Sequence, residues 1–245
     1  MSTKSFTIIP AIDLIEGKAV RLTRGDYAQK KIYNADPVEQ AKAFADAGLK
    51  RLHLVDLDGA KAGKMANLKV LERIAAGVDL EIDFGGGVNH IQDIRDVFNA
   101  GAMMVAIGSV AVKNPELFFT WVREIGGDAI FLGADVREGL LAVKGWTEMT
   151  DISIEDFLEK QIAAGIKNIF CTDISRDGML AGPSVELYTS LIKHFPEMQL
   201  TASGGVSNLE DLDLLKESGC IGVIIGKAIY EGRITLSDLK NYSES

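Results

Sequence analysis

The 245-residue chain has few of the residues that build disulfides or metal sites, with only two cysteines and three histidines. Cys171 and Cys220 each lie inside an apolar segment and form no C-x-x-C motif, so we interpret both as small buried hydrophobic residues. No cysteine or carboxylate lies at metal-ligand spacing from His53, His90 or His194, which argues against a metal site. We therefore expect neither a disulfide framework nor a bound metal.

The sequence also lacks a long apolar run and an excess of basic residues. No run approaches the roughly 18 apolar residues that a membrane-spanning helix needs, and the N-terminus leads into a strand-like stretch without a signal-peptide pattern. Lys and Arg number 26 against 35 Asp and Glu, a net charge of -9, which argues against binding to nucleic acid or an anionic membrane. We expect a soluble, cytoplasmic protein with neither kind of partner.

The chain does contain a regular alternation of short apolar runs with segments of helical periodicity, repeated about eight times. Most of the runs are apolar without strict alternation, which is typical of parallel strands buried on both faces. The eight expected strands cover residues 6–12, 51–57, 80–84, 103–107, 130–135, 168–172, 199–202 and 222–225.

Helix boundaries are marked between these runs. Capping side chains precede a proline or a polar first turn at four expected helix starts, namely Asp36-Pro37, Asn114-Pro115, Ser153 with Asp156, and Asn208. A glycine suited to a left-handed C-cap ends four of the expected helices, at Ala47-Gly48, Ala100-Gly101, Ala164-Gly165 and Ser218-Gly219. Each of these glycines comes just before the next expected strand.

An internal repeat organises the units. The pattern Gly86-Gly87-Val88, Asp93, Gly101, Val105, Ile107, Gly108 recurs 118 positions later as Gly204-Gly205-Val206, Asp211, Gly219, Val223, Ile225, Gly226. Two copies of a four-strand unit predict an α/β fold, a (β/α)8 TIM barrel forming a single domain of residues 1–245, with half-barrel repeats at about 1–122 and 123–245. An open doubly wound sheet is the alternative, and it would leave eight similar units with two edges.

Carboxylates follow three of the expected strands. Asp13 ends the first strand, Asp135 ends the fifth, and Asp177 follows the sixth. In a TIM barrel the C-terminal ends of the strands form the active site, so these side chains are expected at one mouth. Two carboxyl groups in a partly closed mouth can divide into a base and an acid, which makes proton transfer the leading chemistry.

Glycine-rich turns supply a second signal. Backbone amides in such turns bind phosphate well, and the loops after strands seven and eight form the usual phosphate site of a TIM barrel. The turns contain Gly86, Gly87, Gly108 and Ser109 in one half, and Ser203, Gly204, Gly205, Gly226 and Lys227 in the other. Two such sites predict a substrate with a phosphate at each end, although glycine can also serve the tight turn alone.

Two further segments contain candidate substrate-binding residues. Trp146 lies in a polar stretch between the fifth strand and its helix, where it can stack on a heterocycle or simply pack the loop. Residues 17–25 predict a small hairpin after the first strand. Its Lys18 and Arg24 can reach an anionic ligand or remain solvated.

These motifs together resemble one family, the isomerases of histidine biosynthesis that act on a phosphoribosylformimino-aminoimidazole carboxamide ribotide. The resemblance covers nearly the whole chain, and its order and spacing agree throughout. It is found in Ile9-Pro10-Ala11-Ile12-Asp13-Leu14, Val55-Asp56-Leu57-Asp58-Gly59-Ala60, Gly85-Gly86-Gly87, Gly145-Trp146, Thr172-Asp173-Ile174-Ser175-Arg176-Asp177-Gly178 and Ser203-Gly204-Gly205-Val206.

The resemblance implies an Amadori rearrangement without a cofactor, in which an aminoaldose ribotide with two phosphates becomes an aminoketose. It implies that Asp13 is the base, that Asp135 or Asp177 is the acid, and that Thr172 orients the substrate or an aspartate. Trp146 is implied to cover the aminoimidazole ring, and Gly178 to lie at the binding site. A closed barrel of this kind is compatible with a monomer.

The chain departs from the family pattern at three positions. Asn89 stands where many members have an arginine, which puts a charged substrate contact there in doubt. Val136 follows Asp135, and Met179 stands where threonine is usual.

Four other functions are alternatives to the isomerase. The sister cyclase of the pathway usually has a cysteine where Ala11 stands, and a phosphoribosylanthranilate isomerase needs a catalytic cysteine, whereas Cys171 lies within a strand. A bifunctional enzyme acting on both isomerase substrates remains open. A non-catalytic phosphosugar sensor is expected to have lost one of the two carboxylates.

Overall fold

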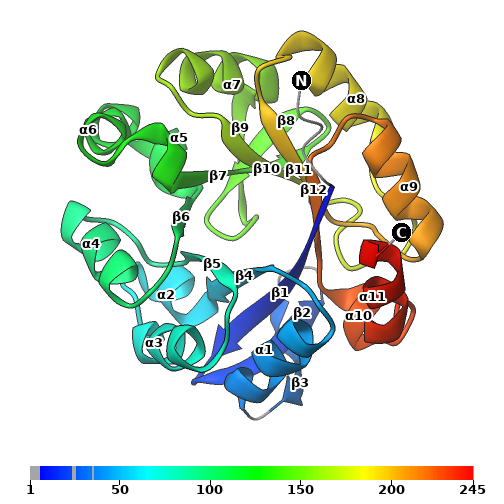
Figure 1. Ribbon diagram of the computed structural model, residues 1–245. Coiled ribbons are helices and arrows are strands. Elements are labelled where there is room, and N and C mark those ends of the chain that lie inside the picture. Colours follow the sequence, from blue (N-terminus) through cyan, green and yellow to red (C-terminus); the bar gives the residue numbers. More distant parts are fainter. Residues whose placement is uncertain (1–5, 24–25, 35, 245) are drawn as a thin grey trace.

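Eight parallel strands form a closed barrel with helices around it (Figure 1) in a computed structural model that describes residues 6–23, 26–34 and 36–244. In ring order the strands are β1 (Thr7–Ile15), β4 (Arg51–Asp56), β5 (Glu81–Gly85), β6 (Met104–Ile107), β7 (Ile130–Arg137), β10 (Asn168–Asp173), β11 (Gln199–Ser203) and β12 (Gly222–Ile225). The seams β7–β10 and β12–β1 are both paired in parallel. The predicted TIM barrel is confirmed, and the open sheet is excluded.

Helices connect and cover the strands. In chain order they are α1 (Pro37–Asp46), α2 (Leu57–Ala62), α3 (Leu68–Gly77), α4 (Ile91–Asn99), α5 (Ser109–Lys113), α6 (Pro115–Ile125), α7 (Ile154–Ala163), α8 (Val185–His194), α9 (Leu209–Glu217), α10 (Lys227–Tyr230) and α11 (Leu236–Glu244), with a 3-10 turn at Gly127–Ala129. No helix in the described part of the chain is long and apolar enough to cross a membrane.

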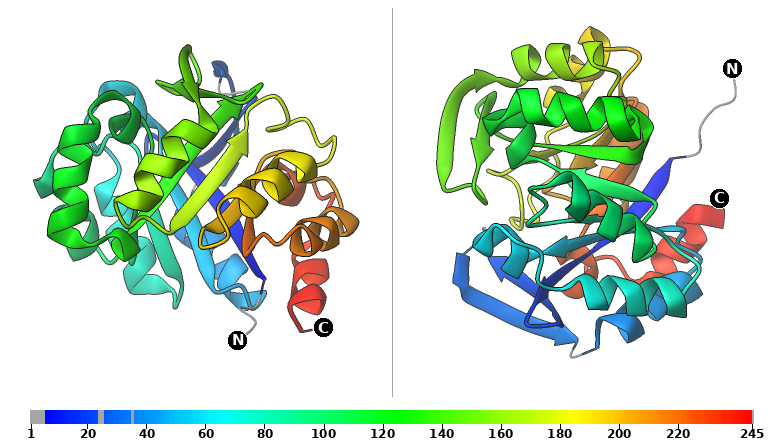
Figure 2. Two further views of the ribbon diagram at one scale, coloured as in Figure 1. Left: turned by 90° about the horizontal axis from the view of Figure 1, so that it is seen from above. Right: turned by 90° about the vertical axis from the view of Figure 1, so that its left-hand side faces the viewer.

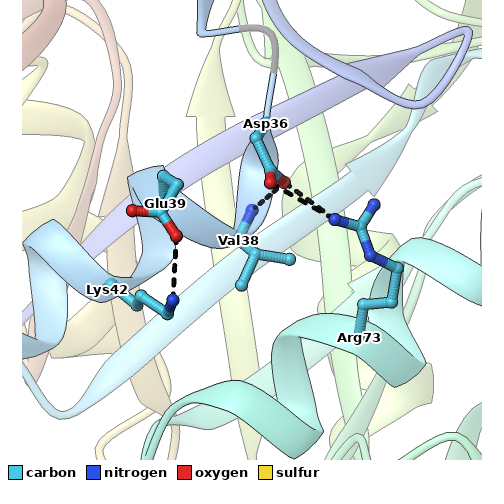
Figure 3. Close-up of polar contacts among 5 residues, drawn as sticks. All are labelled: Asp36, Val38, Glu39, Lys42 and Arg73. Atoms are coloured by element: carbon cyan, nitrogen blue, oxygen red, sulfur yellow. Dashed lines mark hydrogen bonds and ion pairs between the residues drawn. The ribbon is translucent and has the colours of Figure 1, made fainter.

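The helix starts follow the predicted capping chemistry. Asp36 caps α1 by accepting a hydrogen bond from the Val38 amide at 3.1 Å, and Arg73 of α3 donates to the same carboxylate at 3.1 and 3.3 Å (Figure 3). This exposed ion pair ties α1 to α3, but solvent screening limits its contribution to stability. Asn114, Ser153 and Asn208 cap α6, α7 and α9 in the same way.

The helix ends also match the prediction. Gly48, Gly101, Gly165 and Gly219 all have left-handed backbone conformations, with φ of +85°, +100°, +98° and +93°. Residues with a Cβ rarely adopt this conformation, so these glycines turn the chain from each helix toward the next strand.

Apolar side chains fill two layers. The larger layer lies between the barrel and the helices, and its fully buried members include Phe44, Phe118 and Leu200. The smaller layer lies inside the barrel and consists of Ile9, Ala11, Met104, Phe131 and Ile224, with Phe170 packed against it. Because strand side chains alternate, membership of the inner layer shows which residues of β1, β6, β7, β10 and β12 point inward.

Two antiparallel hairpins extend the ends of β1 and β7 on one side of the barrel (Figure 2). The first contains β2 (Lys18–Thr23) and β3 (Asp26–Asn34), where the sequence predicted a hairpin at 17–25. The second contains β8 (Leu140–Val143) and β9 (Glu148–Ser153), where the sequence indicated only a polar connecting segment.

Candidate active site at the C-terminal ends of the strands

Asp13 and Asp135 both point into the mouth of the barrel. Asp13 lies two residues after Ala11 and four after Ile9, so it shares the inward face of β1 with these members of the inner layer. Asp135 lies four residues after Phe131 and shares the inward face of β7 in the same way. Both carboxylates lie near the C-terminal ends of their strands, next to the hairpins that extend those strands. The structure therefore places the two predicted carboxylates at the same opening.

Thr172 stands beside Asp135 across the β7–β10 seam, where the two residues pair in the strand register. Thr172 is buried and lies two residues after the inward-facing Phe170, so it points inward as well. Asp177 follows in the turn after β10, with its amide donating to the Asp173 carbonyl at 3.0 Å. Asp177 is 9% exposed and lies close enough to Asp135 for the two charges to interact.

Desolvation by the surrounding barrel raises the pKa of Asp135 above its ordinary value. Hydrogen bonding from Trp146 and from Thr172 opposes this rise, the negative charge of Asp177 adds to it, and the charge of His53 lowers the pKa again. The balance leaves Asp135 protonated to a higher pH than an exposed aspartate. A raised pKa suits a carboxyl group to the role of a general acid.

Trp146 reaches Asp135 from the tip of the β8–β9 hairpin. Lys144, Gly145 and Trp146 have successive left-handed conformations, with φ of +54°, +61° and +73°. Such conformations are costly for residues other than glycine and are common at functional turns. The Lys144 amide also donates to the Ser109 hydroxyl at 3.4 Å, so the tip is tied to the turn after β6.

The first glycine turn packs against the loop after β4. A Cβ on Gly86 would lie 2.1 Å from the Asp56 carbonyl oxygen, and one on Gly87 would lie 2.7 Å from the backbone of Lys64 and Met65. Asp56 is fully buried and accepts hydrogen bonds from the amides of that loop. Close backbone approach therefore accounts for glycine at both positions.

The second glycine turn repeats this arrangement in the other half. A Cβ on Gly204 would lie 3.1 Å from the Asp173 carbonyl oxygen, and one on Gly205 would lie 2.3 Å from that of Gly182. Asp173 accepts from the Ser175 amide at 2.9 Å and from the Ser184 hydroxyl, as Asp56 does from its own loop. The sequence repeat thus corresponds to matching loop contacts.

We expect Gly86→Ala to destabilise the fold by at least about 3 kcal/mol, because a Cβ there meets backbone atoms in a left-handed conformation. Gly48→Ala is the matched control, since Gly48 is also left-handed but has no heavy atom within 4 Å of a Cβ. That change should cost only about 1 kcal/mol. Urea unfolding measures both, and equal losses would contradict the packing explanation.

The remaining glycine turns lead into short helices at the same end of the barrel. Gly108 and Ser109 begin α5, and Gly226 and Lys227 begin α10. The Lys227 ammonium donates to the Gly178 carbonyl at 2.7 Å, which joins the turn after β12 to the loop after β10. Ser203, the last residue of β11, is buried and points inward beside Thr172.

Two further positions from the sequence analysis are Arg24 and Asn89. Arg24 lies outside the described residues. Asn89 donates to the carbonyls of Gly63 and Gly87 at 2.8 and 3.2 Å, so its amide bridges two turns of the first half.

Cys171 faces away from the mouth, into the layer between the barrel and the helices. Burial raises the pKa of its thiol well above the ordinary value. Burial likewise raises the pKa of the Cys220 thiol to about 11. Both cysteines are buried, as expected, and Cys171 is not placed to act as a nucleophile in the mouth.

A polar group that the sequence did not indicate lies below the carboxylates. His53 of β4 contacts Asp83 of β5, and the two residues pair in the strand register although 30 positions separate them in the chain. His53 was seen as isolated because no acidic residue is near it in sequence at a ligand spacing. Alternation along both strands, once their register was known, was the only signal for this contact.

The comparisons with known proteins agree with one another. The family model described as "Histidine biosynthesis protein" matches residues 7–235. A 1-(5-phosphoribosyl)-5-((5-phosphoribosylamino)methylideneamino) imidazole-4-carboxamide isomerase of Azobacteroides pseudotrichonymphae is 56% identical over 236 residues, covering 96% of this chain and 98% of the relative. Isomerases of the same name from Bacteroides thetaiotaomicron and Parabacteroides distasonis are 54% and 50% identical, over 95% and 96% of this chain and 98% and 99% of the relatives.

Proposed function

The chain belongs to the histidine biosynthesis protein family and is an isomerase of that pathway, and we propose how the groups in its barrel mouth carry out the reaction. The reaction is an Amadori rearrangement, which converts the aminoaldose ribotide N-(5-phosphoribosylformimino)-5-aminoimidazole-4-carboxamide ribonucleotide into its aminoketose form. The sister cyclase and a phosphoribosylanthranilate isomerase are not favoured, because the relatives carry the isomerase name.

Ring opening is the first step. A general acid protonates the ribose ring oxygen, the bond from this oxygen to C1′ breaks, and the nitrogen lone pair forms a Schiff base at C1′. Asp135 suits this step because its raised pKa lets it keep a proton to higher pH than an exposed aspartate does. The side chains of Trp146 and Thr172 both hydrogen-bond to its carboxyl group.

Proton abstraction follows. A base removes the proton from C2′, and the electron pair moves toward the nitrogen to give an enolamine. Protonation at C1′ and loss of the C2′ hydroxyl proton then give the ketone. Asp13 suits the base role because it faces the same mouth from β1, on a different strand from Asp135.

The glycine-rich turns of the two halves are suited to bind the two phosphates of the substrate. The turns with Gly86, Gly87, Gly108 and Ser109 come at the ends of β5 and β6, and those with Ser203, Gly204, Gly205, Gly226 and Lys227 come at the ends of β11 and β12. Amides at these turns can hold one phosphate on each side of the mouth. The substrate then spans the opening between the two halves, with Trp146 over its heterocycle.

We also propose that the protein acts as a monomer in the cytoplasm, as one domain made of half-barrels at about 1–122 and 123–245. The barrel closes within one chain, and both carboxylates come from that chain. Sedimentation of the purified protein at assay concentration tests the monomer.

The single observation that supports this mechanism best is the pair of inward carboxylates in one mouth, one of them with a raised pKa. Single-turnover absorbance with the aminoaldose ribotide, coupled to the cyclase, tests it. Turnover of the ribotide is expected, and phosphoribosylanthranilate as a parallel substrate reports any second activity. Absence of ribotide turnover, with ammonia-dependent consumption of the ketose product, would contradict the proposal in favour of the cyclase.

A further inference from the structure

A buried polar cluster lies inside the barrel, below the carboxylates of the mouth. It consists of Arg51 and His53 on β4 and Asp83 on β5. The Asp83 side chain is 0% exposed, and its two oxygens contact different partners. His53 Nδ1 is hydrogen-bonded to Oδ1, and the Arg51 guanidinium lies 3.5 Å from Oδ2.

The cluster fixes the protons on the imidazole ring. Asp83 forms an ion pair with Arg51, and a carboxylate accepts hydrogen bonds without donating them, so we assign the proton of the His53–Asp83 contact to Nδ1 of His53. The other ring nitrogen, Nε2, has no hydrogen-bond partner in the described part of the chain. In the described residues, the fully buried side-chain atoms without a hydrogen-bond partner are Arg51 Nε, Gln161 Oε1 and Thr201 Oγ1, and Nε2 is not one of them. Nε2 is therefore not fully enclosed by protein atoms.

Aromatic rings hold the imidazole in place. The ring centroids of Phe170 and Phe131 lie 5.1 and 6.2 Å from that of His53, both in edge-on geometry. The Arg51 guanidinium lies 5.1 Å from the centroid of Phe131, on whose ring it packs. The orientation of His53 is thus set by packing as well as by hydrogen bonding.

The cluster is coupled to the mouth through charge. The charge of His53 acts on Asp135 and opposes the effect of Asp177 on the same carboxyl group. Among the described residues, the charged groups that act on Asp135 are His53 from β4 and Asp177 from the loop after β10, while the Cys171 thiol lies on the opposite face of β10. Those that face His53 are Asp83, with Arg51 behind it, and Asp135.

We propose that Asp83, anchored by Arg51, is a positioning residue for the isomerisation, which holds His53 with Nδ1 protonated and presents Nε2 to the floor of the mouth below Asp135. The inference rests on the proposed function, because it gives His53 and Asp83 a task in that reaction. Asp83 itself touches neither substrate nor reacting atoms, and it acts through His53.

Asp83→Asn tests the proposal by removing the charge while keeping the side-chain shape. We expect kcat to fall by roughly 10- to 100-fold, with KM little changed, since the phosphate turns are untouched. The variant also releases the His53 ring from its fixed position, and in the wild type the charge of His53 lowers the pKa of Asp135. The alkaline limb of the kcat profile that reports Asp135 should therefore move to higher pH.

His53→Gln keeps the Arg51–Asp83 pair and provides a second route if Asp83→Asn does not fold. It should move the same limb in the same direction. Combining the two substitutions should add little to either one alone, because both remove the same device. Multiplicative losses, or a pH profile identical to the wild type in both variants, would overturn the proposal.

Thr201→Val is the matched control. Thr201 points into the barrel beside Phe170, is fully buried, and its hydroxyl has no hydrogen-bond partner in the described chain. A change there tests interior packing without touching the cluster. It should leave the pH profile in place.

Nitrogen-15 NMR of the imidazole in the resting wild-type protein separates this inference from the proposed function. A proton on Nδ1 is expected for His53, and a neutral ring protonated only at Nε2 would overturn the inference whatever the activity. Absence of ribotide turnover in the wild type would instead remove the proposed function and leave the NMR result standing.

Discussion

Asp13→Asn should lower kcat by at least about 10³-fold and leave ribotide binding nearly intact, because the amide keeps the shape of the side chain but cannot take the C2′ proton. The side chain faces the mouth from β1, between its partners on β2 and β4. Isothermal titration of the variant with the ribotide, beside single-turnover absorbance, separates binding from chemistry.

Asp151→Asn is a suitable control for this experiment. Asp151 is an exposed aspartate on β9, and replacing it makes the same chemical change at a residue that has no proposed role in the reaction. Its turnover should equal that of the wild type. If Asp13→Asn turned over at close to the wild-type rate, the base would have to be sought elsewhere in the mouth.

Asp135→Asn should cost at least about 10²-fold in kcat and should remove the alkaline limb of the pH profile. Burial raises the pKa of Asp135 in the folded protein, so the acid form is present at low pH and is lost as the pH rises through that value. An amide does not titrate there. Asp177→Asn, measured beside it, should retain the limb at a lower pH, because the negative charge of Asp177 raises the pKa of Asp135.

Stability gives this pair of variants an independent readout. A carboxyl group whose pKa is higher in the folded than in the unfolded chain destabilises the fold progressively as the pH rises through the two values. Asp135→Asn should therefore unfold at higher urea than the wild type near neutral pH, with the advantage vanishing in acid. A limb that disappears in Asp177→Asn and persists in Asp135→Asn would exchange the roles of the two residues.

Most of the barrel could be predicted because its parallel strands are buried on both faces. The run at 222–225 matches β12, and the capping predictions at Asp36, Asn114 and Ser153 match α1, α6 and α7. The β8–β9 hairpin could not be predicted in this way. Four of the six β9 residues are exposed, so that strand has no apolar periodicity to distinguish it from a loop.

Some residues of the candidate site could also be predicted from the sequence, and others could not. Asp13 and Asp135 were predictable because each follows an apolar run that the fold turns into a strand, whereas Thr172 was indicated only by the family resemblance. The pairing of His53 with Asp83 depends on which residues of β4 and β5 stand opposite each other, and no local pattern specifies that register. The packing role of Gly86 likewise depends on a backbone contact with a distant loop.

Closure of the barrel joins the first strand to the last. Thr7 pairs with Gly222, and the Tyr230 hydroxyl donates to the Ala11 carbonyl across 219 positions. At roughly 5 to 20 residues per second, a ribosome needs about 10 to 40 s to make the intervening chain. During that interval one edge of β1 has no partner, and an unpaired apolar edge can join other chains. Nascent chains stalled before residue 222 should therefore depend most on chaperones.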